Sequence, residues 1–459
     1  MDLLCNRDMG ESVIMRESKQ PQNMAHQNIT SKKLISSHPG TPDFGVSGTE
    51  VTRTRTGNPK LLKLAVLSFY LLFYSLFFFA QQGCNEFSVD NGDNSSYPDG
   101  ICGPGDNEDM EHGRLVVATE QYGSGGGVTV IDMDTTVPQI NVALTHDDVT
   151  LRWYDNKIWV INRFGADNIT ILDGDDYRLL KQFSVKIAEN TPCNPHDIAF
   201  LDRCRLYVSC YEQPFLAIVN PQAKQGEEII GQIDLSSLAD DDGIPEASHM
   251  KLTEKGVWVT IAGMRRNHGW VPGEFSYLAR IDTQTDTLAQ TIALAGKNPV
   301  SPIKLSDNGD YLVVSTAGDW SGADAGLELV DTLSEKSEMS ISAADLGGIV
   351  SNFTLDETNC GFALVTAPST YETSIKRYCL EPKKSIDSCI PRGSFLITDI
   401  ALTDDGRLVV TDTSSRPAGV WFYESHDCSL LVDHLIPTGF APGFTTPLLL
   451  VPDPVPTPD

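Results

Sequence analysis

Polar and titratable residues that could do chemistry recur at one position of a repeated sequence pattern. Each of them lies at the start of a short apolar run. Aligned on those runs, they are Asp147, Asp148, His196, Asp197, Ser248, His249, Ser301, Ser351, Asn352, Thr398 and Asp399, with Glu246 just upstream of Ser248. If the runs are equivalent strands around one axis, these groups converge, and they can hold a metal ion or orient a polar ligand. The candidate ligand-binding residues are therefore His196, Asp197, Glu246 and His249.

The same positions have a simpler interpretation. The inner strands of a closed repeat array present small polar residues to a water-filled channel. In addition, Asp or Asn ahead of a strand commonly closes a turn through its own side chain. The sequence leaves the binding site and the ordinary polar wall open as alternatives.

Longer connecting segments supply a second set of candidates. These segments carry Arg163, Arg265, Arg266, His268, Trp270 and Trp320. Arg and Trp are over-represented among residues that dominate binding interfaces, and long loops on a rigid scaffold are where binding usually resides. Candidate contacts to a protein, peptide or envelope ligand are therefore Arg163, Arg265, Trp270 and Trp320. For Arg265 and Arg266, pairing with nearby carboxylates is an equal alternative.

Short strands in a regular repeat must position these residues. Segment 298–331 shows the unit, with apolar runs at 303–305, 311–315 and 327–330 and an Asp-Asn-Gly-Asp turn between the first two. Runs rich in β-branched and aromatic residues, separated by Asp, Asn and Gly, indicate antiparallel strands. The seventh unit, for example, contains ITDIAL, RLVVTDT, GVWFYE and LLVDHLI.

The period of the repeat predicts the fold class. From residue 114 to 437 the unit occurs seven times at about 46 residues, and four strands at that period are typical of a β-propeller blade. The runs are apolar on both faces, so each blade needs a neighbour on either side. We therefore predict an all-β, seven-bladed β-propeller of four-stranded antiparallel blades. A β-sandwich is the alternative, but it does not require this period.

A propeller sorts its connections onto two faces. The turns between first and second strands, such as residues 155–157 and 404–406, are short and fall on one face, here named the turn face. The segments before each first strand, and those between second and third strands, are longer and fall on the other face. We name it the loop-rich face, and the candidate residues lie there.

Three segments carry a family resemblance: KIWVINRFGADNITILD (157–173), RLYVSCYEQPFLAIVN (205–220) and YLVVSTAGDWSGADAGLELVD (311–331). They resemble the YVTN repeat of surface-layer-like propellers, in which a Tyr-Val-Thr-Asn strand, a Gly-containing loop and a Val-Ile-Asp strand follow each other. NPHDIAFL and NPVSPIKL resemble the family's Pro-containing start of the next blade. The resemblance implies the propeller fold. Together with the missing catalytic motifs it indicates a binding or scaffold role without catalysis, and no cofactor is predicted.

Two enzyme classes remain as alternatives. The chain is also similar in outline to propeller lactonases, which hold a divalent metal in the channel. The counterparts here would be Glu246, Asn352 and Asp399 around calcium or zinc, although the flanking sequence departs from that family. A quinoprotein-like dehydrogenase subunit has only the shared fold in its favour. The sequence has no HExxH, Gly-x-Ser-x-Gly, phosphate-loop or CxxCH motif.

An apolar segment precedes the repeats. Residues 64–80, LAVLSFYLLFYSLFFFA, are uncharged and follow Arg53, Arg55, Lys60 and Lys63. They predict a signal or membrane-spanning segment at 61–83, with the following chain outside the cytoplasm, periplasmic or at the cell surface. Gly83-Cys84 resembles the lipobox of bacterial lipoproteins, although Gln81 departs from it. The segment is therefore either the signal peptide of a lipoprotein acylated at Cys84 or an uncleaved membrane anchor. Residues 1–60 are expected to be a disordered cytoplasmic tail or a misassigned leader.

Charge and cysteine content narrow the partners and the compartment. The net charge of −28 makes nucleic acid an improbable partner, because phosphate backbones are repelled. Eight cysteines lie between residues 102 and 428, and an even number in an exported domain predicts disulfides. Residues 84–113 are expected to be a flexible acidic linker, and 438–459 a closing segment with a Pro-rich tail.

Overall fold

The computed structural model describes residues 102–105, 112–121, 123–189, 191–306, 309–319, 321–380, 382–394, 396–414, 416–444 and 447–453. The chain divides into two units, Met1–Ala65 and Val66–Asp459, and every described residue lies in the second. The predicted tail, the membrane segment and Cys84 lie outside the described residues. Within the described ranges, no helix has the length and apolar character needed to cross a membrane.

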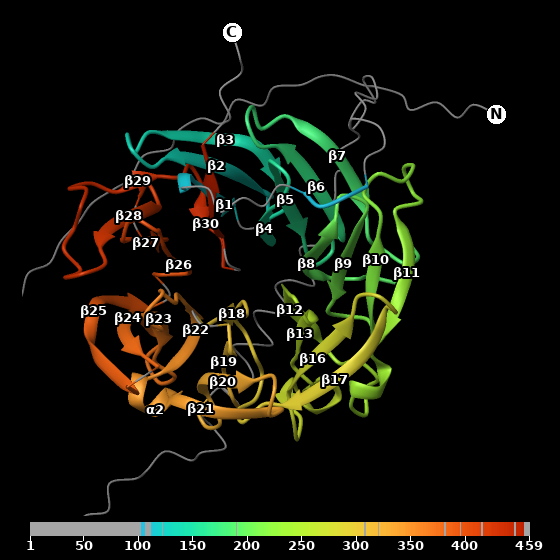
Figure 1. Ribbon diagram of the computed structural model, residues 1–459. Helices are drawn as coiled ribbons and strands as arrows, with labels where there is room; N and C mark the ends of the chain where they lie inside the picture. Colours follow the sequence, from blue (N-terminus) through green and yellow to red (C-terminus); the bar gives the residue numbers. More distant parts are fainter. Residues whose placement is uncertain are drawn as a thin grey trace, which may run out of the picture. The chain divides into compact units, whose positions relative to one another are not determined.

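Seven antiparallel sheets surround a common axis (Figure 1). Strands are given from the inner to the outer one. Blade 2 consists of β4 (Val149–Trp153), β5 (Lys157–Asn162), β6 (Asn168–Asp173) and β7 (Leu179–Ser184), and blade 3 of β8 (Pro195–Asp202), β9 (Arg205–Cys210), β10 (Phe215–Val219) and β11 (Ile229–Asp234). Blade 4 consists of β12 (Ala247–Thr253), β13 (Gly256–Ile261), β16 (Tyr277–Asp282) and β17 (Thr287–Ala293). Blade 5 consists of β18 (Lys304–Leu305), β19 (Tyr311–Thr316), β20 (Gly326–Asp331) and β21 (Lys336–Ser342), and blade 6 of β22 (Ile349–Phe353), β23 (Cys360–Thr366), β24 (Glu372–Cys379) and β25 (Lys384–Ser394). Blade 7 consists of β26 (Ile400–Leu402), β27 (Arg407–Asp412), β28 (Gly419–Glu424) and β29 (Ile436–Pro437). The predicted all-β, seven-bladed propeller is confirmed.

The two ends of the described chain meet in blade 1. Its outer strands are β1 (His112–Glu120), β2 (Gly126–Asp132) and β3 (Pro138–Thr145), while β30 (Ala441–Pro442) and β31 (Leu448–Pro452) pair with β1 on the inner side. Buried Arg114 supports this pairing, because its Nε donates a hydrogen bond to the Pro452 carbonyl at 2.8 Å. The last strand therefore completes the first blade.

Short elements decorate this frame. A two-stranded ribbon, β14 (Met264–Arg265) with β15 (Val271–Pro272), extends from blade 4, and the 3-10 turn η2 (Arg266–His268) lies between its strands. The other short elements are η1 (Ser236–Leu238) and α2 (Ala343–Leu346).

The hydrophobic core lies between neighbouring blades. Among the described residues, seven apolar clusters each join one blade to the next. Trp159, Tyr207 and Trp258 occupy the same position in the second strands of blades 2 to 4 and are almost fully buried. This arrangement explains why the runs are apolar on both faces.

Four disulfides link cysteines in the described chain, so the prediction of disulfides is confirmed. They are Cys102–Cys204, Cys193–Cys210, Cys360–Cys379 and Cys389–Cys428. Two of them close short loops within a blade, and Cys389–Cys428 joins blades 6 and 7. Four disulfides indicate an oxidising, extracytoplasmic location.

One predicted strand is wrong in extent. The run LLVDHLI was expected to form the outer strand of the seventh blade, but β29 contains only its last residue, Ile436, followed by Pro437. Leu430 and Leu431 are exposed. An outer strand has a sheet neighbour on one side only, so apolar residues there are a weak guide to pairing.

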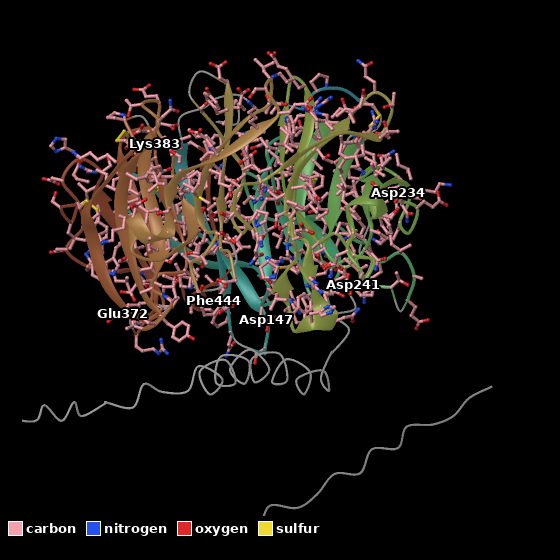
Figure 2. The ribbon with its side chains drawn as sticks, turned by 90° about the horizontal axis from the view of Figure 1, so that it is seen from below. Asp147, Asp234, Asp241, Glu372, Lys383 and Phe444 are labelled. Carbon is pink, nitrogen blue, oxygen red and sulfur yellow. A yellow bond between two sulfur atoms is a disulfide. The ribbon has the colours of Figure 1, made fainter. Side chains whose placement is uncertain are left out.

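The two faces are visible from the side (Figure 2). Asp147 and Asp241, which precede inner strands, lie on one side together with Glu372 and Phe444. Lys383, between β24 and β25, lies on the opposite side. The connections are therefore sorted as the topology requires, and the first side is the loop-rich face.

Candidate functional site on the loop-rich face

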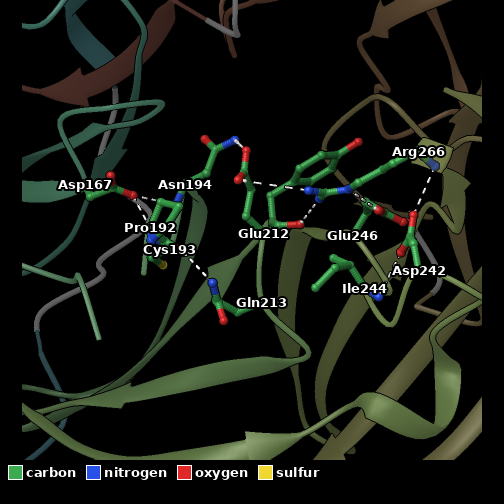
Figure 3. Close-up of polar contacts among 11 residues, drawn as sticks. Asp167, Pro192, Cys193, Asn194, Glu212, Gln213, Asp242, Ile244, Glu246 and Arg266 are labelled. Carbon is green, nitrogen blue, oxygen red and sulfur yellow. Dashed lines mark hydrogen bonds and ion pairs between the residues drawn. The ribbon is translucent and has the colours of Figure 1, made fainter. Parts of the chain in front are cut away.

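The segment before β8 fixes the position of His196. Asp167 is buried, and its Oδ1 accepts hydrogen bonds from the backbone N–H groups of Cys193 (2.9 Å) and Asn194 (2.6 Å) (Figure 3). Asn194 has a φ of 48°, in the left-handed region that Asn tolerates better than most residues. The chain therefore turns sharply into the inner strand, and His196 is the second residue of that strand.

His196 is held as a neutral imidazole. The Arg163 guanidinium donates a hydrogen bond to its Nε2 at 2.7 Å, so Nδ1 carries the ring proton and donates to Ser248 Oγ at 2.9 Å. Burial, with a smaller contribution from the Arg163 charge, holds the pKa of His196 well below its usual range. The ring therefore orients its neighbours and does not carry charge at neutral pH.

Aromatic and guanidinium groups around His196 come from three blades. The Tyr211 ring stacks on His196 with 4.1 Å between ring centroids and 9° between planes. The Arg266 guanidinium lies 5.8 Å from the Tyr211 ring centroid and 4.9 Å from that of Trp270. We name Arg163, His196, Tyr211, Arg266 and Trp270 the guanidinium–aromatic stack. Cation–π contacts of this kind stabilise by ~0.5–2 kcal/mol each.

Glu246 positions the far end of the stack. It is fully buried, and its carboxylate accepts a hydrogen bond from Arg266 Nε at 2.8 Å (Figure 3). It accepts another from the Met264 backbone N–H at 2.7 Å. Burial raises the pKa of Glu246 to about 7, and the hydrogen bond from Arg266 opposes that rise. Its φ of 52° is uncommon for glutamate. Glu246 thus anchors the β14–β15 ribbon to the start of β12.

Asp197 and His249 lie deeper along the inner strands. Asp197 accepts a hydrogen bond from Arg152 Nε at 2.7 Å and another from the Met250 backbone N–H at 2.8 Å, so it ties β4, β8 and β12 together. His249 Nε2 donates to the Val300 carbonyl at 3.3 Å, and its buried Nδ1 has no hydrogen-bond partner among the described residues. Burial lowers the pKa of His249 to about 4. Asp197 therefore has a structural role, because it connects three inner strands.

The residues of the metal alternative make separate sets of contacts. Asn352 Nδ2 donates a hydrogen bond to Asp399 Oδ1, and Asp399 Oδ2 accepts one from the Leu448 backbone N–H at 3.0 Å. Glu246 makes its contacts on a different blade. Burial raises the pKa of Asp399 to about 6. Across the ranges that the structure covers, no group of three or more His, Cys, Asp or Glu side chains is placed to hold a metal ion.

Other candidates have different surroundings. The Arg265 side chain is 40 % exposed, and its Nε lies 4.0 Å from Asp241 Oδ1, so it pairs only loosely with the acidic rim. Trp320 lies outside the described residues. Tyr211 is not among the residues predicted from the sequence, yet a signal exists: Tyr211 directly follows the second strand of blade 3, as Arg163 does in blade 2.

Comparisons with known proteins show the fold. No family model and no curated protein matches the chain. A protein from Lactobacillus plantarum is 13 % identical over 74 % of this chain and 99 % of its own, with a TM-score of 0.52. Two candidate 6-phosphogluconolactonases, from Bacteroides uniformis and Bacteroides fragilis, are each 11 % identical with a TM-score of 0.51. They cover 74 % and 75 % of this chain, and 100 % and 98 % of their own chains are covered.

Proposed function

We propose that the chain is an extracytoplasmic propeller that binds a protein or peptide on its loop-rich face, as a binding or scaffold module. In this proposal residues 61–83, or a lipid on Cys84, tether it to the membrane. The likeness to YVTN-repeat propellers supports a binding role. The polar groups of His196, Asp197 and Glu246 support it too, because each is engaged in positioning its neighbours.

The observation that carries the proposal is the β14–β15 ribbon. Glu246 holds its first strand and the stack holds the connection between its strands, while Val271 (41 %), which pairs with Arg265, and Phe275 (49 %), three residues after β15, are exposed. A rigidly held ribbon with exposed aromatic, aliphatic and Arg side chains at and beside it has the composition of an interface centre. Ordering costs on binding are then small, because the ribbon is already fixed.

Charge near the ribbon indicates the chemistry of the partner. Asp241 and Glu274 are exposed on the same face, and the whole chain carries a net charge of −28. Complementary charge steers association and excludes wrong partners. The proposed partner therefore offers apolar side chains to Val271 and Phe275, together with basic groups for the carboxylates.

A pair of alanine substitutions tests the choice of face. A photoreactive phenylalanine at position 275, introduced in intact cells, first identifies the contacting protein by crosslinking. The affinity of that protein for the propeller and for each variant is then measured by titration. Phe275→Ala should weaken binding by ~1–3 kcal/mol, because it removes an exposed anchor. Leu333→Ala is the matched control, since Leu333 is 74 % exposed on the turn face between β20 and β21. Binding that falls with Leu333→Ala and ignores Phe275→Ala would contradict the proposal.

A further inference from the structure

Three basic residues occupy one level of the central channel. Arg152, Lys251 and Lys304 belong to the inner strands β4, β12 and β18. Each pairs with the third residue of the following strand, Trp159, Trp258 and Val313 respectively, so the three positions are equivalent. We name Arg152, Lys251 and Lys304 the cation layer.

The cation layer lines a cavity. The cavity has a volume of about 550 Å³, and all seven inner strands contribute to its wall. The residues equivalent to the cation layer in the other blades are Ala199, Thr354, Ala401 and Leu449. None of the seven is acidic, although acidic residues outnumber basic ones by 62 to 34 in the whole chain. The composition of the chain therefore does not account for this layer.

Two of the three charges lack a counter-charge in contact. Arg152 is paired with Asp197 at 2.7 Å. For Lys251 and Lys304, no described residue forms an ion pair or a hydrogen bond with the ammonium group. Burial lowers the pKa of Lys304, and the nearby Lys251 charge lowers it further, while Asp399 acts in the opposite direction. Like charges in a partly desolvated cavity destabilise each other, so an added anion would relieve that repulsion.

The channel wall already binds carboxylates of the protein itself. The inner edge of an inner strand has no strand partner, so its backbone N–H groups remain available as donors. Asp197 takes one of these donors, from Met250, and Asp399 takes another, from Leu448. The wall therefore already accommodates oxyanions at its backbone N–H groups, and the two ammonium groups without a counter-charge in contact add positive charge beside them.

We propose that the central channel binds a small anion that carries at least two negative charges on carboxylate or phosphate groups. The volume falls within the range of small-molecule sites, which is ~300–1,000 Å³. A long polyanion such as nucleic acid is disfavoured, because its other charges would meet the acidic surface. The site is separate from the β14–β15 ribbon, so the proposal does not depend on the proposed function.

Calorimetric titration of the full chain with inorganic phosphate and with citrate, at neutral pH and low ionic strength, tests the site. Gluconate, which has one charge, is the control probe. We expect phosphate or citrate to bind at least tenfold more tightly than gluconate, about 1.4 kcal/mol. Binding of phosphate alone would assign a phosphorylated ligand, and binding of citrate alone a polycarboxylate. If neither phosphate nor citrate gives a heat of binding, the proposal is wrong.

Matched variants assign binding to the cation layer. Lys251→Gln combined with Lys304→Gln should weaken the binding of the active probe by about tenfold or more, because it removes both free charges. Lys255→Gln makes the same change on an exposed turn of blade 4, where Lys255 Nζ donates to Thr332 Oγ1 at 2.9 Å, and it should leave binding unchanged. Lys304→Arg keeps the charge and should retain binding. Equal affinities in the double variant and in Lys255→Gln would refute the assignment.

A stability measurement separates lost binding from lost folding. Without anion, the double variant should melt at the same temperature as the wild type or higher, because a repelling pair is gone. Added phosphate or citrate should raise the melting temperature of the wild type and not that of the double variant. An anion-induced rise that is the same in both proteins would contradict the proposal.

Discussion

Carboxylates near the channel differ in how fully their charge is compensated. Asp197 accepts hydrogen bonds from Arg152 and from backbone N–H groups. Glu120, at the end of β1, lies instead near two other carboxylates. Burial, and then the charges of Asp147 and Asp148, raise its pKa to about 8. Glu120 therefore retains a proton at neutral pH that it would lose in the unfolded chain.

This proton makes stability depend on pH. Between the unfolded pKa of 4.5 and the folded value of about 8, the native state binds more protons at Glu120 than the unfolded state does. The contribution of Glu120 to the free energy of unfolding therefore falls as pH rises through that window. Glu120→Gln removes this dependence, so its melting temperature relative to the wild type should be higher at pH 9 than at pH 5.

The control for this prediction is Glu254→Gln, which neutralises an exposed carboxylate on the β12–β13 turn. Its difference from the wild type should stay nearly constant between the two pH values. If Glu120→Gln behaves in the same way as Glu254→Gln, the carboxylate cluster of Glu120, Asp147 and Asp148 does not couple to folding.

At the residue scale, the sequence predicted where polar groups gather but not how they pair. The ring alignment placed His196 and Ser248 at equivalent positions, and they do hydrogen-bond to each other. It could not show that Glu246 enters the strand with a positive φ and points its carboxylate to Met264 and Arg266. Side-chain direction in such a turn depends on a backbone conformation that residue type alone does not specify.

At the element scale, closure of the ring depends on β31. Leu448–Pro452 supplies the main inner strand of blade 1 and accepts the buried Arg114 guanidinium at the Pro452 carbonyl. The backbone N–H of Leu448 also satisfies Asp399. Removal of β31 would leave the Arg114 guanidinium without the Pro452 carbonyl and the Asp399 carboxylate without the Leu448 N–H. It would also uncover the inner edge of β1.

Deletion of residues 447–459 should therefore abolish cooperative unfolding, because blades 1 and 7 lose a shared boundary. Urea unfolding followed by tryptophan fluorescence measures this directly. Deletion of residues 454–459 is the control, since it removes only residues that follow the last paired strand. An unfolding curve for the larger deletion that overlays the control would show that blade 1 is stable without β31.

The repeat made the blades predictable because each needs two apolar faces. That requirement is strict for the second and third strands, such as Lys157–Asn162 and Asn168–Asp173, which pair on both sides. It is weak for an outer strand, as the shortened β29 shows. The guanidinium–aromatic stack was not predictable as a unit, because it joins loops of three blades whose relative placement follows from ring closure.

At the scale of the whole molecule, the disulfides relate the fold to its compartment. Cys102–Cys204 ties a segment ahead of the propeller to blade 3, and the backbone N–H of Gly105 donates a hydrogen bond to the Tyr154 hydroxyl at 2.8 Å. Cys389–Cys428 joins two neighbouring blades. These disulfides join parts of the fold that only non-covalent packing would otherwise connect.

Exported protein should therefore show no free thiol from the eight cysteines between residues 102 and 428, when thiols are titrated in denaturant without reductant. Reduction should lower stability by ~2–4 kcal/mol for each disulfide, and most for Cys102–Cys204, which closes the longest loop, with a sequence separation of 102. Cys102→Ser with Cys204→Ser should reproduce that largest loss, whereas Cys360→Ser with Cys379→Ser, at a separation of 19, should cost less. Eight free thiols in exported protein would contradict both the pairing and the oxidising location, because cysteines held this close oxidise wherever the compartment permits it.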